Sequence, residues 1–358
     1  MASPGETWPD ILTTLLDGGD LTADRARWAM EQVMAGEADP VAVAGFLVAL
    51  RAKGETVPEV EGLVDVMLSR AVRIEVPGET VDIVGTGGDR LNTVNISTMS
   101  AVAVAATGLT VVKHGNRAAS SMTGTADVLE HLGIPLTLSP EIVRQVALEA
   151  GITFCFANSF HPSMRHAAPA RAGLRVPTVF NILGPMTNPA QPRYSAVGVA
   201  NPRYAPIIAG VFASRGRDAL IFRGEEGLDE LSPAGPSRFW WVAGGEVREG
   251  VLTPEDVGLE RCTLDDIRGG APEANAVVAR AVLRGEQVPA RSAVLLNAGA
   301  AHALANARGT MPADPAAAIA ASVPTIAAVL DDGRAEQTLA RWSEASHRLG
   351  DARCGSSA

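Results

Sequence analysis

A glycine-rich turn follows the first strand-like stretch of the sequence. The apolar residues Val81, Ile83 and Val84 lead into Gly85–Asp89, which reads GTGGD. Glycines there allow backbone N–H groups to approach an anion without hindrance from Cβ atoms. The turn matches neither GxGxxG, whose third glycine would fall at Arg90, nor a phosphate loop ending in Gly-Lys-Ser/Thr. It predicts an anion site suited to ribose hydroxyls or a metal-complexed diphosphate, although taken alone it is equally consistent with a purely structural connection.

Two further polar segments follow apolar ones in a way that favours phosphate binding. The segment Asn95–Thr98 (NIST) opens an apolar helix, and the N–H groups at a helix N-terminus attract anions. The segment Lys113–Arg117 (KHGNR) ends a predicted strand with cationic donors, and residues 118–125 (AASSMTGT) add four hydroxyls. Each segment alone fits a helix cap or a solvated surface. Because α/β proteins bind ligands at strand ends, the three segments together predict one phosphate site.

Two adjacent carboxylates, Asp229 and Glu230, lie in the sequence GLDELSP after a further strand and a glycine turn. Magnesium prefers oxygen ligands and typically uses one or two carboxylates together with waters and substrate phosphate oxygens. The pair therefore fits a magnesium site beside a diphosphate, but most adjacent acids are solvated surface residues. His161 and His166 lack a carboxylate companion, so core or surface positions are expected for them.

The elements that must position these residues predict an α/β protein with a small all-helical N-terminal domain. Residues 8–72 have a helical pattern, with Ala26, Ala29, Met30 and Val33 on one stripe. After Pro77, aliphatic runs alternate with helical ones, which indicates a larger α/β domain with a central, mostly parallel sheet. The expected strands are 81–84, 109–113, 152–157, 194–199 and 219–222, and the expected helices are 96–106, 125–132, 141–150 and 204–214.

The remaining segments complete the expected domain organisation. Residues 239–251 predict a β-hairpin at the edge of the sheet, and the alanine-rich stretch from residue 274 onward predicts two or three helices. We expect a helical domain at 1–75, completed by a later segment near 170–190, and an α/β domain at 76–358.

Composition excludes several classes of function. The 358 residues carry a net charge of -10 with a sequence pI near 5.2, which argues against a nucleic-acid partner. The three cysteines show neither disulfide nor zinc spacing. The sequence shows no basic and apolar leader and no apolar run long enough to span a membrane. These features predict a cytoplasmic protein without a membrane partner.

Several long segments share one resemblance. The matching stretches, in order, are VDIVGTGGD, NIST, VVKHGNRAASS, TADVLEHLG, FANSFHPSMRHAAPAR, PTVFNILGPMTNPA and GLDELS. In this combination the sequence resembles the anthranilate phosphoribosyltransferases of the tryptophan pathway over about residues 10–340. The resemblance implies Mg²⁺-dependent transfer of the 5-phosphoribosyl group from phosphoribosyl pyrophosphate (PRPP) to the amine of anthranilate, with release of pyrophosphate. It also implies a homodimer that forms through the helical domain.

The resemblance assigns roles to individual residues. Magnesium would be contacted by Ser97, Asp229 and Glu230, and anthranilate by Gly85, Asn116 and Arg171, whose guanidinium can pair with a carboxylate. His114 and residues 177–185 would line the same pocket. The residues implied to hold PRPP are Gly85, Gly88, Asp89, Thr93, Asn95, Ile96, Ser97, Thr98, Lys113, His114, Gly115, Asn116, Arg117, Ala118, Ala119, Ser120, Ser121 and Thr125.

Departures from the family pattern leave alternatives open. Ala172 and Gly173 follow Arg171 where the family commonly has an arginine and an acid, and Asn158-Ser159 replaces a proline-containing pair. A substituted anthranilate is therefore an alternative acceptor. A pyrimidine nucleoside phosphorylase or a non-catalytic nucleic-acid-binding relative would have a related fold. The sequence shows no Ser-His-Asp pattern or activated cysteine, so we expect catalysis by positioning and electrostatics rather than through a covalent enzyme intermediate.

Overall fold

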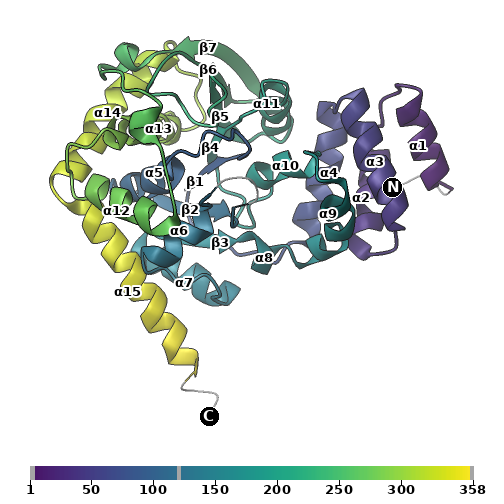
Figure 1. Ribbon diagram of the computed structural model, residues 1–358, viewed down its shortest axis with the longest axis horizontal. Coiled ribbons are helices and arrows are strands. Elements are labelled where there is room, and N and C mark those ends of the chain that lie inside the picture. The colour runs from purple at the N-terminus through teal and green to yellow at the C-terminus, as the bar shows by residue number, and fades with distance from the viewer. Residues whose placement is uncertain (1–4, 119–121, 355–358) are drawn as a thin grey trace.

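A helical bundle lies beside an α/β body in the computed structural model, which describes residues 5–118 and 122–354 (Figure 1). The bundle begins with α1 (Trp8–Leu16), α2 (Ala23–Ala35), α3 (Pro40–Lys53) and α4 (Val57–Arg70). The Thr22 hydroxyl caps α2 by accepting a hydrogen bond from the Arg25 N–H. The stripe of Ala26, Ala29, Met30 and Val33 is buried, as its spacing predicts.

A later segment of the chain returns to this bundle. Helices α8 (Ala157–Phe160), α9 (Ala168–Leu174) and α10 (Phe180–Leu183) lie in sequence between strands β3 (Ile152–Phe156) and β4 (Tyr194–Gly198). They bridge the two parts of the molecule (Figure 1). Helix α9 packs on α3, and α10 packs on α4. Ala170 and Phe180 accordingly belong to the same apolar cluster as the bundle core.

The α/β body is built on a seven-stranded sheet in the order β3-β2-β1-β4-β5-β6-β7. The strands β1 to β5 are parallel, whereas β6 and β7 form an antiparallel edge hairpin. This arrangement confirms the mixed, mostly parallel sheet expected from the sequence. The strands are β1 (Thr80–Gly85), β2 (Thr110–Gly115), β3 (Ile152–Phe156), β4 (Tyr194–Gly198), β5 (Asp218–Gly224), β6 (Ser237–Ala243) and β7 (Glu246–Leu252).

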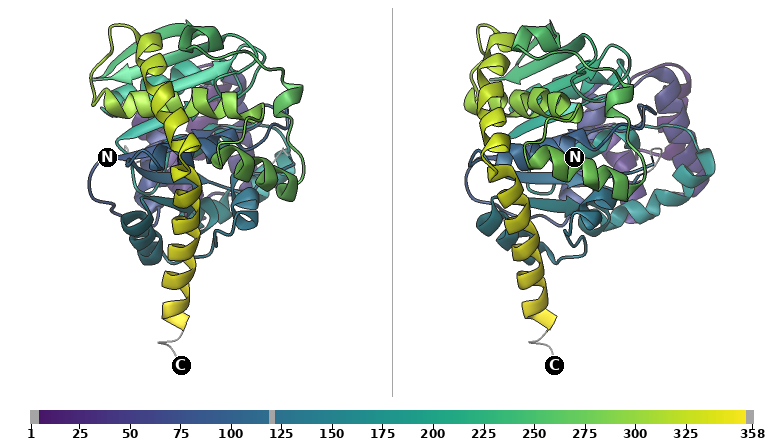
Figure 2. Two further views of the ribbon diagram at one scale, coloured as in Figure 1. Left: turned by 90° about the vertical axis from the view of Figure 1, so that its left-hand side faces the viewer. Right: turned by 60° about the vertical axis from the view of Figure 1, so that its left-hand side comes forward.

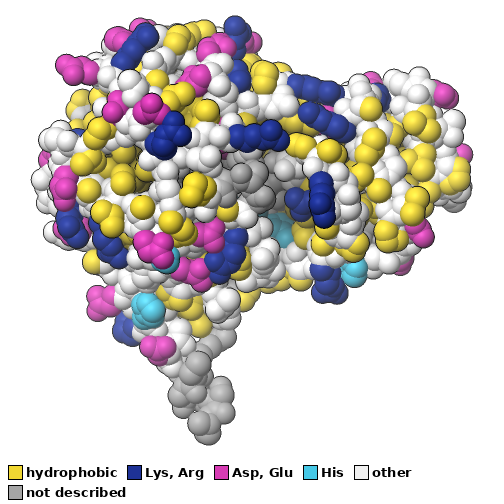
Figure 3. Space-filling model, in the orientation of Figure 1, with side chains coloured by type: hydrophobic (Ala, Val, Ile, Leu, Met, Phe, Trp, Pro, Cys, Tyr) yellow, Lys and Arg dark blue, Asp and Glu magenta, His cyan; other side chains and the backbone are white. Residues whose placement is uncertain are grey.

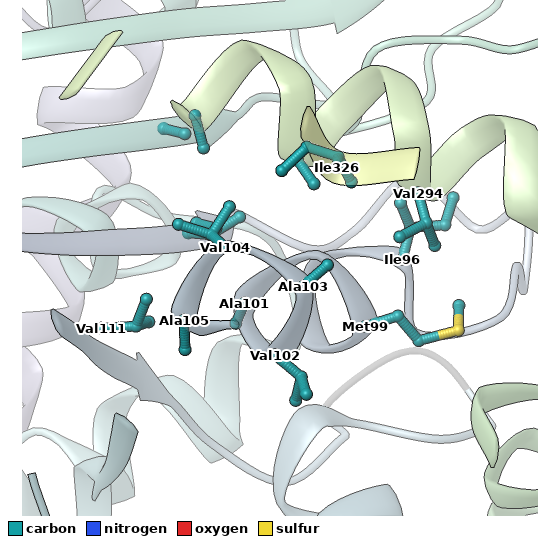
Figure 4. Packing of buried hydrophobic residues seen from close by; sticks show 14 of the residues in the cluster. Ile96, Met99, Ala101, Val102, Ala103, Val104, Ala105, Val111, Val294 and Ile326 are labelled. Atoms are coloured by element: carbon teal, nitrogen blue, oxygen red, sulfur yellow. The ribbon is translucent and has the colours of Figure 1, made fainter. Parts of the chain in front are cut away.

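Helices cover both faces of the sheet because successive strand residues point to opposite sides. Val81 and Ile83 pack toward α5 (Ile96–Ala105), whereas Val84 packs toward α11 (Tyr204–Ser214) and the bundle. Helix α5 is buried on all sides, and its small residues allow close approach of the neighbouring helices, with Val294 and Ile326 above it (Figure 4). The connections between parallel strands also contain α6 (Thr125–His131) and α7 (Pro140–Ala150).

Four helices, rather than the expected two or three, occupy the described chain after residue 271. They are α12 (Pro272–Leu283), α13 (Ala290–Asn306), α14 (Pro315–Asp331) and α15 (Arg334–Cys354), and α15 extends beyond the body (Figure 2). Gly285, Gly309 and Gly333 separate them in left-handed conformations. In residues 5–118 and 122–354 no single helix is long and apolar enough to cross a membrane, although α14 and the first part of α15, a bent pair, meet the length and composition criteria together.

Polar contacts join the bundle to the α/β body. The Arg215 guanidinium at the end of α11 pairs with Asp65 of α4. The Tyr204 hydroxyl donates to Glu55 Oε1 at 3.0 Å, and Arg51 contacts the same hydroxyl. The relative position of the two parts is therefore fixed by ion pairs and hydrogen bonds as well as by the shared apolar cluster.

Candidate active site

A cavity of about 640 Å³ lies where the carboxyl ends of β1 and β2 face the α8–α10 segment. Figure 3 shows the corresponding hollow between bundle and body, with Lys and Arg side chains gathered near its rim. The sheet supplies one wall through the loops after β1 and β2, and the bridging segment supplies the other. The location agrees with the rule that ligands of open α/β sheets bind beyond the carboxyl ends of the strands.

Most of the residues that the sequence singles out line this cavity. Thr98 and Lys113 are buried just beneath its surface, and Ala119, Ser120 and Ser121 lie outside the described residues. The lining residues among those singled out are Gly85, Gly88, Asp89, Thr93, Asn95, Ile96, Ser97, His114, Gly115, Asn116, Arg117, Ala118, Thr125, Arg171, Asp229 and Glu230.

The Asp229–Glu230 pair lies against the ends of β1 and β4, where two glycines make room for it. A Cβ atom at Gly85 would lie 2.2 Å from Asp229 Oδ2, and one at Gly198 would lie 1.6 Å from the Asp229 carbonyl oxygen. The Gly87 N–H donates to Asp229 Oδ2 at 2.7 Å. The glycines thus allow the acidic segment to contact the glycine turn directly.

Asp229 and Glu230, together with Asp89, form an acidic end of the cavity, and the first two have raised pKa values. Burial, together with the nearby charges of Asp89 and Glu230, raises the pKa of Asp229 well above its ordinary value. Burial likewise raises the pKa of Glu230 to about 8, although Lys113 and the Ser97 N–H act in the opposite direction. Three carboxylates therefore gather where a cation would relieve their desolvation and repulsion.

Lys113 lies beneath this acidic end. Its ammonium group donates to the carbonyl oxygen of Ile83 and to Ser97 Oγ, the latter at 3.2 Å. Burial lowers the pKa of Lys113, whereas Asp82, Glu230 and Asp229 raise it. Asp82 is itself buried, with a pKa raised to about 6 by desolvation. Lys113 therefore links the core carboxylate to the cavity carboxylates and orients the hydroxyl at the start of α5.

Arg117, at the beginning of the loop after β2, is already paired within the chain. Its Nη1 lies 2.9 Å from Asp127 Oδ1 and 2.7 Å from Glu130 Oε2, both on α6. Against the effect of burial, hydrogen bonds from the Ala118 and Gly124 N–H groups and from Arg117 lower the pKa of Asp127, and the Arg117 guanidinium lowers the pKa of Glu130. Asp127 Oδ2 also accepts from the Ala118 and Gly124 N–H groups. Arg117 therefore anchors the loop, whereas its side chain was expected to offer a free donor array to phosphate.

The opposite end of the cavity combines imidazoles with an arginine. The rings of His114 and His161 lie 5.2 Å apart, and burial lowers their pKa values to about 3 and about 4. His114 Nδ1 is 3.0 Å from the Gly184 carbonyl, which only accepts, so Nδ1 carries the proton and Nε2 is an acceptor. Both imidazoles are neutral near pH 7.

Arg171 projects from α9 over the ring of Phe180, with its guanidinium carbon 5.4 Å from the ring centre. Burial lowers the pKa of Arg171. Among the described residues no carboxylate forms an ion pair with it. A partly buried guanidinium without a partner suits an anionic ligand.

Known proteins share both parts of this architecture. The sequence profile of the glycosyl transferase family, a/b domain, matches residues 77–336, and that of the glycosyl transferase family, helical bundle domain, matches residues 9–71. An anthranilate phosphoribosyltransferase of Arthrobacter sp. (strain FB24) is 54% identical over 340 residues, which cover 94% of this chain and 96% of that relative. The chain belongs to the anthranilate phosphoribosyltransferase family.

Solved structures agree with this membership. The crystal structure of anthranilate phosphoribosyltransferase from Thermus thermophilus superposes with a TM-score of 0.87 at 41% identity, over 94% of this chain and 99% of that one. The enzyme from Saccharomyces cerevisiae in complex with PRPP and Mg gives a TM-score of 0.83 at 25% identity, over 95% and 98% of the two chains. The resemblance and the fold class expected from the sequence are confirmed.

Some cavity residues of this anthranilate phosphoribosyltransferase family member were not singled out from the sequence. Thr86 and Thr123 line the cavity without having been assigned a role. Asn158, which the sequence marked only as a departure from the family pattern, also lines it, and its Oδ1 accepts from Asn116 Nδ2 at 3.3 Å. Thr86 and Asn158 lie inside the motifs that carried the resemblance, so the motifs themselves were the available signal. Gly198 ends β4 in a plain apolar run, and nothing local indicates that its missing Cβ makes room for Asp229.

Proposed function

We propose that the chain uses this cavity to transfer the 5-phosphoribosyl group of PRPP to the amine nitrogen of anthranilate, giving N-(5-phosphoribosyl)anthranilate and pyrophosphate. In activity it is an anthranilate phosphoribosyltransferase, an enzyme of tryptophan biosynthesis. The observation that carries the proposal is the asymmetry of the cavity. One end is acidic and rich in backbone N–H groups, whereas the other presents neutral imidazoles and Arg171, which has no ion-pair partner among the described residues.

The donor is assigned to the wall formed by the sheet loops. The glycine turn, the start of α5 and the β2 loop all open into the cavity, and each presents N–H groups or hydroxyls to it. Thr98 and Lys113 support this wall from below. The assigned residues are Gly85, Gly88, Asp89, Thr93, Asn95 to Thr98, Lys113 to Ser121 and Thr125, of which Ala119, Ser120 and Ser121 lie outside the described residues.

The acidic end fits Mg²⁺. Ser97, Asp229 and Glu230 offer the oxygen ligands that magnesium prefers. Burial raises the pKa of Glu230 to about 8, so a bound cation would stabilise its ionised form. Among the described residues no group of three or more His, Cys, Asp and Glu side chains could hold a metal by itself. That suits Mg²⁺, which completes its coordination with waters and substrate phosphates. The ion would neutralise charge on the departing diphosphate.

The acceptor is assigned to Gly85, Asn116 and Arg171. The Arg171 guanidinium would pair with the anthranilate carboxylate, which orients the ring and brings the amine toward the ribose carbon. Asn116 is held by Asn158 and by the Arg117 N–H, which donates to its Oδ1 at 2.8 Å. The aniline-type nitrogen is neutral at pH 7, so attack needs no prior deprotonation.

One observation favours a second candidate, the same transfer to a substituted anthranilate. Asn158 places a carboxamide at the cavity wall. A ring substituent with a polar group would find a partner there. The nucleoside phosphorylase and nucleic-acid-binding alternatives are not retained, because family membership assigns a different reaction.

The remaining proposals concern organisation. We propose domains at 1–75 and 76–358, the first completed by residues near 170–190, as the packing of α9 and α10 on the bundle supports. A homodimer through the helical domain is supported by the exposed Leu16 and Val41, which are 76% and 81% accessible. A cytoplasmic location is supported by the free thiols of Cys155 and Cys262.

The reaction is tested by mixing the purified protein with PRPP, Mg²⁺ and anthranilate and following the loss of anthranilate fluorescence. Turnover that requires both PRPP and Mg²⁺ is expected. Replacing anthranilate by ring-substituted analogues and comparing kcat/KM decides between the two acceptors. No turnover of any anthranilate, together with phosphorolysis of uridine or thymidine, would refute the assignment.

A further inference from the structure

Residues 267–270, a short segment before α12 that we call the strap, lie along residues 92–95, which lead into α5. The Val94 N–H donates to the Ile267 carbonyl at 3.0 Å, and the Gly269 N–H donates to the Asn92 carbonyl at 2.7 Å. Thr93 and Arg268 form an antiparallel bridge between them. A Cβ atom at Gly269 would lie 2.5 Å from the Thr93 carbonyl oxygen, so the two backbones are in close contact. The strap therefore fixes the cavity segment 92–95 from behind.

Asn275, in the first turn of α12, connects this strap to Asn95. Its side chain is buried, with 2% of its surface accessible. The Gly270 N–H donates to Asn275 Oδ1 at 2.8 Å, which fixes the orientation of the carboxamide because a backbone N–H cannot accept. Asn275 Nδ2 then donates to Asn95 Oδ1 at 2.9 Å. Both ends of the Asn275 carboxamide are thus occupied.

These contacts continue into the turn before α6. Asn95 Nδ2 faces the Thr123 carbonyl at 3.5 Å, and the Thr123 hydroxyl donates to the Gly270 carbonyl at 2.6 Å. The strap, Asn275, Asn95 and Thr123 form a closed ring of hydrogen bonds. Asn95 and Thr123 line the cavity, whereas Asn275 is not among the described residues that line it.

The ring changes what Asn95 does at the start of α5. Asparagine is among the best N-cap residues, because its side-chain oxygen can accept from the N–H groups of its own helix. Asn95 occupies the N-cap position of α5 but makes no such side-chain bond. Its oxygen is held by Asn275 instead, so the N–H groups of the first turn stay free of that side chain. One of them, from Ser97, bonds to Glu230.

We infer that Asn275 is a positioning residue for the phosphoribosyl donor. It holds the Asn95 side-chain oxygen, so that the Asn95 carboxamide keeps one orientation at the donor wall. The inference rests on the proposed assignment of that wall to PRPP. Loss of the Asn275 carboxamide releases the Asn95 oxygen, and the Asn95 side chain is then free to leave the orientation that it has at the donor wall.

The test measures PRPP binding by calorimetry in the presence of Mg²⁺ together with steady-state kinetics. Asn275→Ala should raise both the Kd and the KM for PRPP about tenfold, the effect of one lost hydrogen bond that orients a ligand group, and change the KM for anthranilate by less than about twofold. Thr338→Val is the matched control, because Thr338 is buried in α15 and, among the described contacts, its hydroxyl bonds only within that helix, donating to Arg334 O and accepting from Arg341 Nη2. The control should leave both KM values unchanged.

A mutant cycle separates positioning from general structural support. Asn95→Ala alone should weaken PRPP binding, and Asn275→Ala added to it should weaken binding by less than about twofold more, since Asn275 acts through Asn95. If Asn275→Ala does not fold, Asn275→Asp keeps the bond from Gly270 and loses only the donor to Asn95. Its added charge is corrected for by measuring it in the Asn95→Ala background as well.

Two results would overturn the inference. One is an equal loss of PRPP affinity on replacing Asn275 in the presence and absence of the Asn95 side chain. The other is an equal rise in the KM values of both substrates. A wild-type protein that binds no PRPP would instead overturn the donor assignment itself, so the two failures are distinguishable.

Discussion

Arg171 offers the sharpest test of how the acceptor is held. A guanidinium that pairs with a carboxylate makes charge-assisted hydrogen bonds worth about 1.5–3 kcal/mol. Arg171 is partly exposed, so a value of about 2 kcal/mol is reasonable, which corresponds to about a 30-fold loss of kcat/KM for anthranilate in Arg171→Ala. The KM for PRPP should change by less than about twofold, because the donor wall lies on the sheet.

The assay compares anthranilate with aniline, which lacks the carboxylate. Arg171→Ala should lower kcat/KM for anthranilate but leave that for aniline nearly unchanged, since aniline has nothing for the guanidinium to bind. Arg171→Lys keeps the charge without the planar guanidinium, so its kcat/KM for anthranilate should lie between the values of wild type and Arg171→Ala. Arg175→Asn removes an exposed arginine four residues away, at a left-handed position that Asn tolerates, and serves as the control.

Thermal stability provides an independent test of the role of Arg171. Arg171 has no ion-pair partner among the described residues, and burial disfavours its charge. Its replacement by alanine should therefore leave Tm unchanged or raise it, as measured by thermal unfolding without ligands. Equal losses of kcat/KM for anthranilate and aniline, or a Tm decrease together with a raised KM for PRPP, would refute pairing with the carboxylate.

Three further predictions concern the acidic end of the cavity. Replacing Asp229 and Glu230 together by alanine should abolish Mg²⁺-dependent turnover in the fluorescence assay but keep the far-ultraviolet circular dichroism of the fold, and retained turnover would exclude them as ligands. Because the pKa of Glu230 is raised to about 8, the metal-free wild-type protein should lose stability as the pH rises from about 4.5 to about 8. Glu230→Gln lacks this titration, so its Tm minus the wild-type Tm should become more positive between about pH 5 and about pH 8. A Tm difference that does not change with pH would contradict this. Gly198→Ala should displace the Asp229 backbone and raise the Mg²⁺ concentration needed for half-maximal rate, whereas Gly235→Ala, with open space at its Cβ, should not.

Much of the fold was predictable because its patterns are local. The parallel strands and the helices between them carry continuous apolar runs or amphipathic stripes, and the start of α5 lies where the sequence placed it, at Ile96. The C-terminal helices were undercounted because alanine-rich segments have little polarity contrast. The breaks in the pattern are then single glycines such as Gly309 and prolines such as Pro315, which are easily overlooked.

Most residues of the candidate site could be predicted from the sequence, but several of the contacts among them could not. Motif residues converge because strand ends meet at one edge of a parallel sheet. The contact of Asn275 with Asn95 joins positions 180 residues apart, so no local spacing could indicate it. The pairing of Arg117 with Glu130 was missed for a different reason. The sequence shows that an arginine follows a strand, but not whether an acid on the next helix already neutralises it.

The packing of α9 on α3 has a consequence for how such a protein can change. The arginine assigned to the acceptor is carried by a segment whose supporting contacts lie in the bundle, while the groups assigned to the donor are carried by the sheet. Substitutions within residues 157–181 therefore alter the acceptor side without entering the strands that hold the donor loops. A variant library confined to that stretch would change which amines the protein accepts and leave the groups that bind the departing diphosphate unchanged. The bridging segment is therefore a suitable target for directed evolution toward new amines.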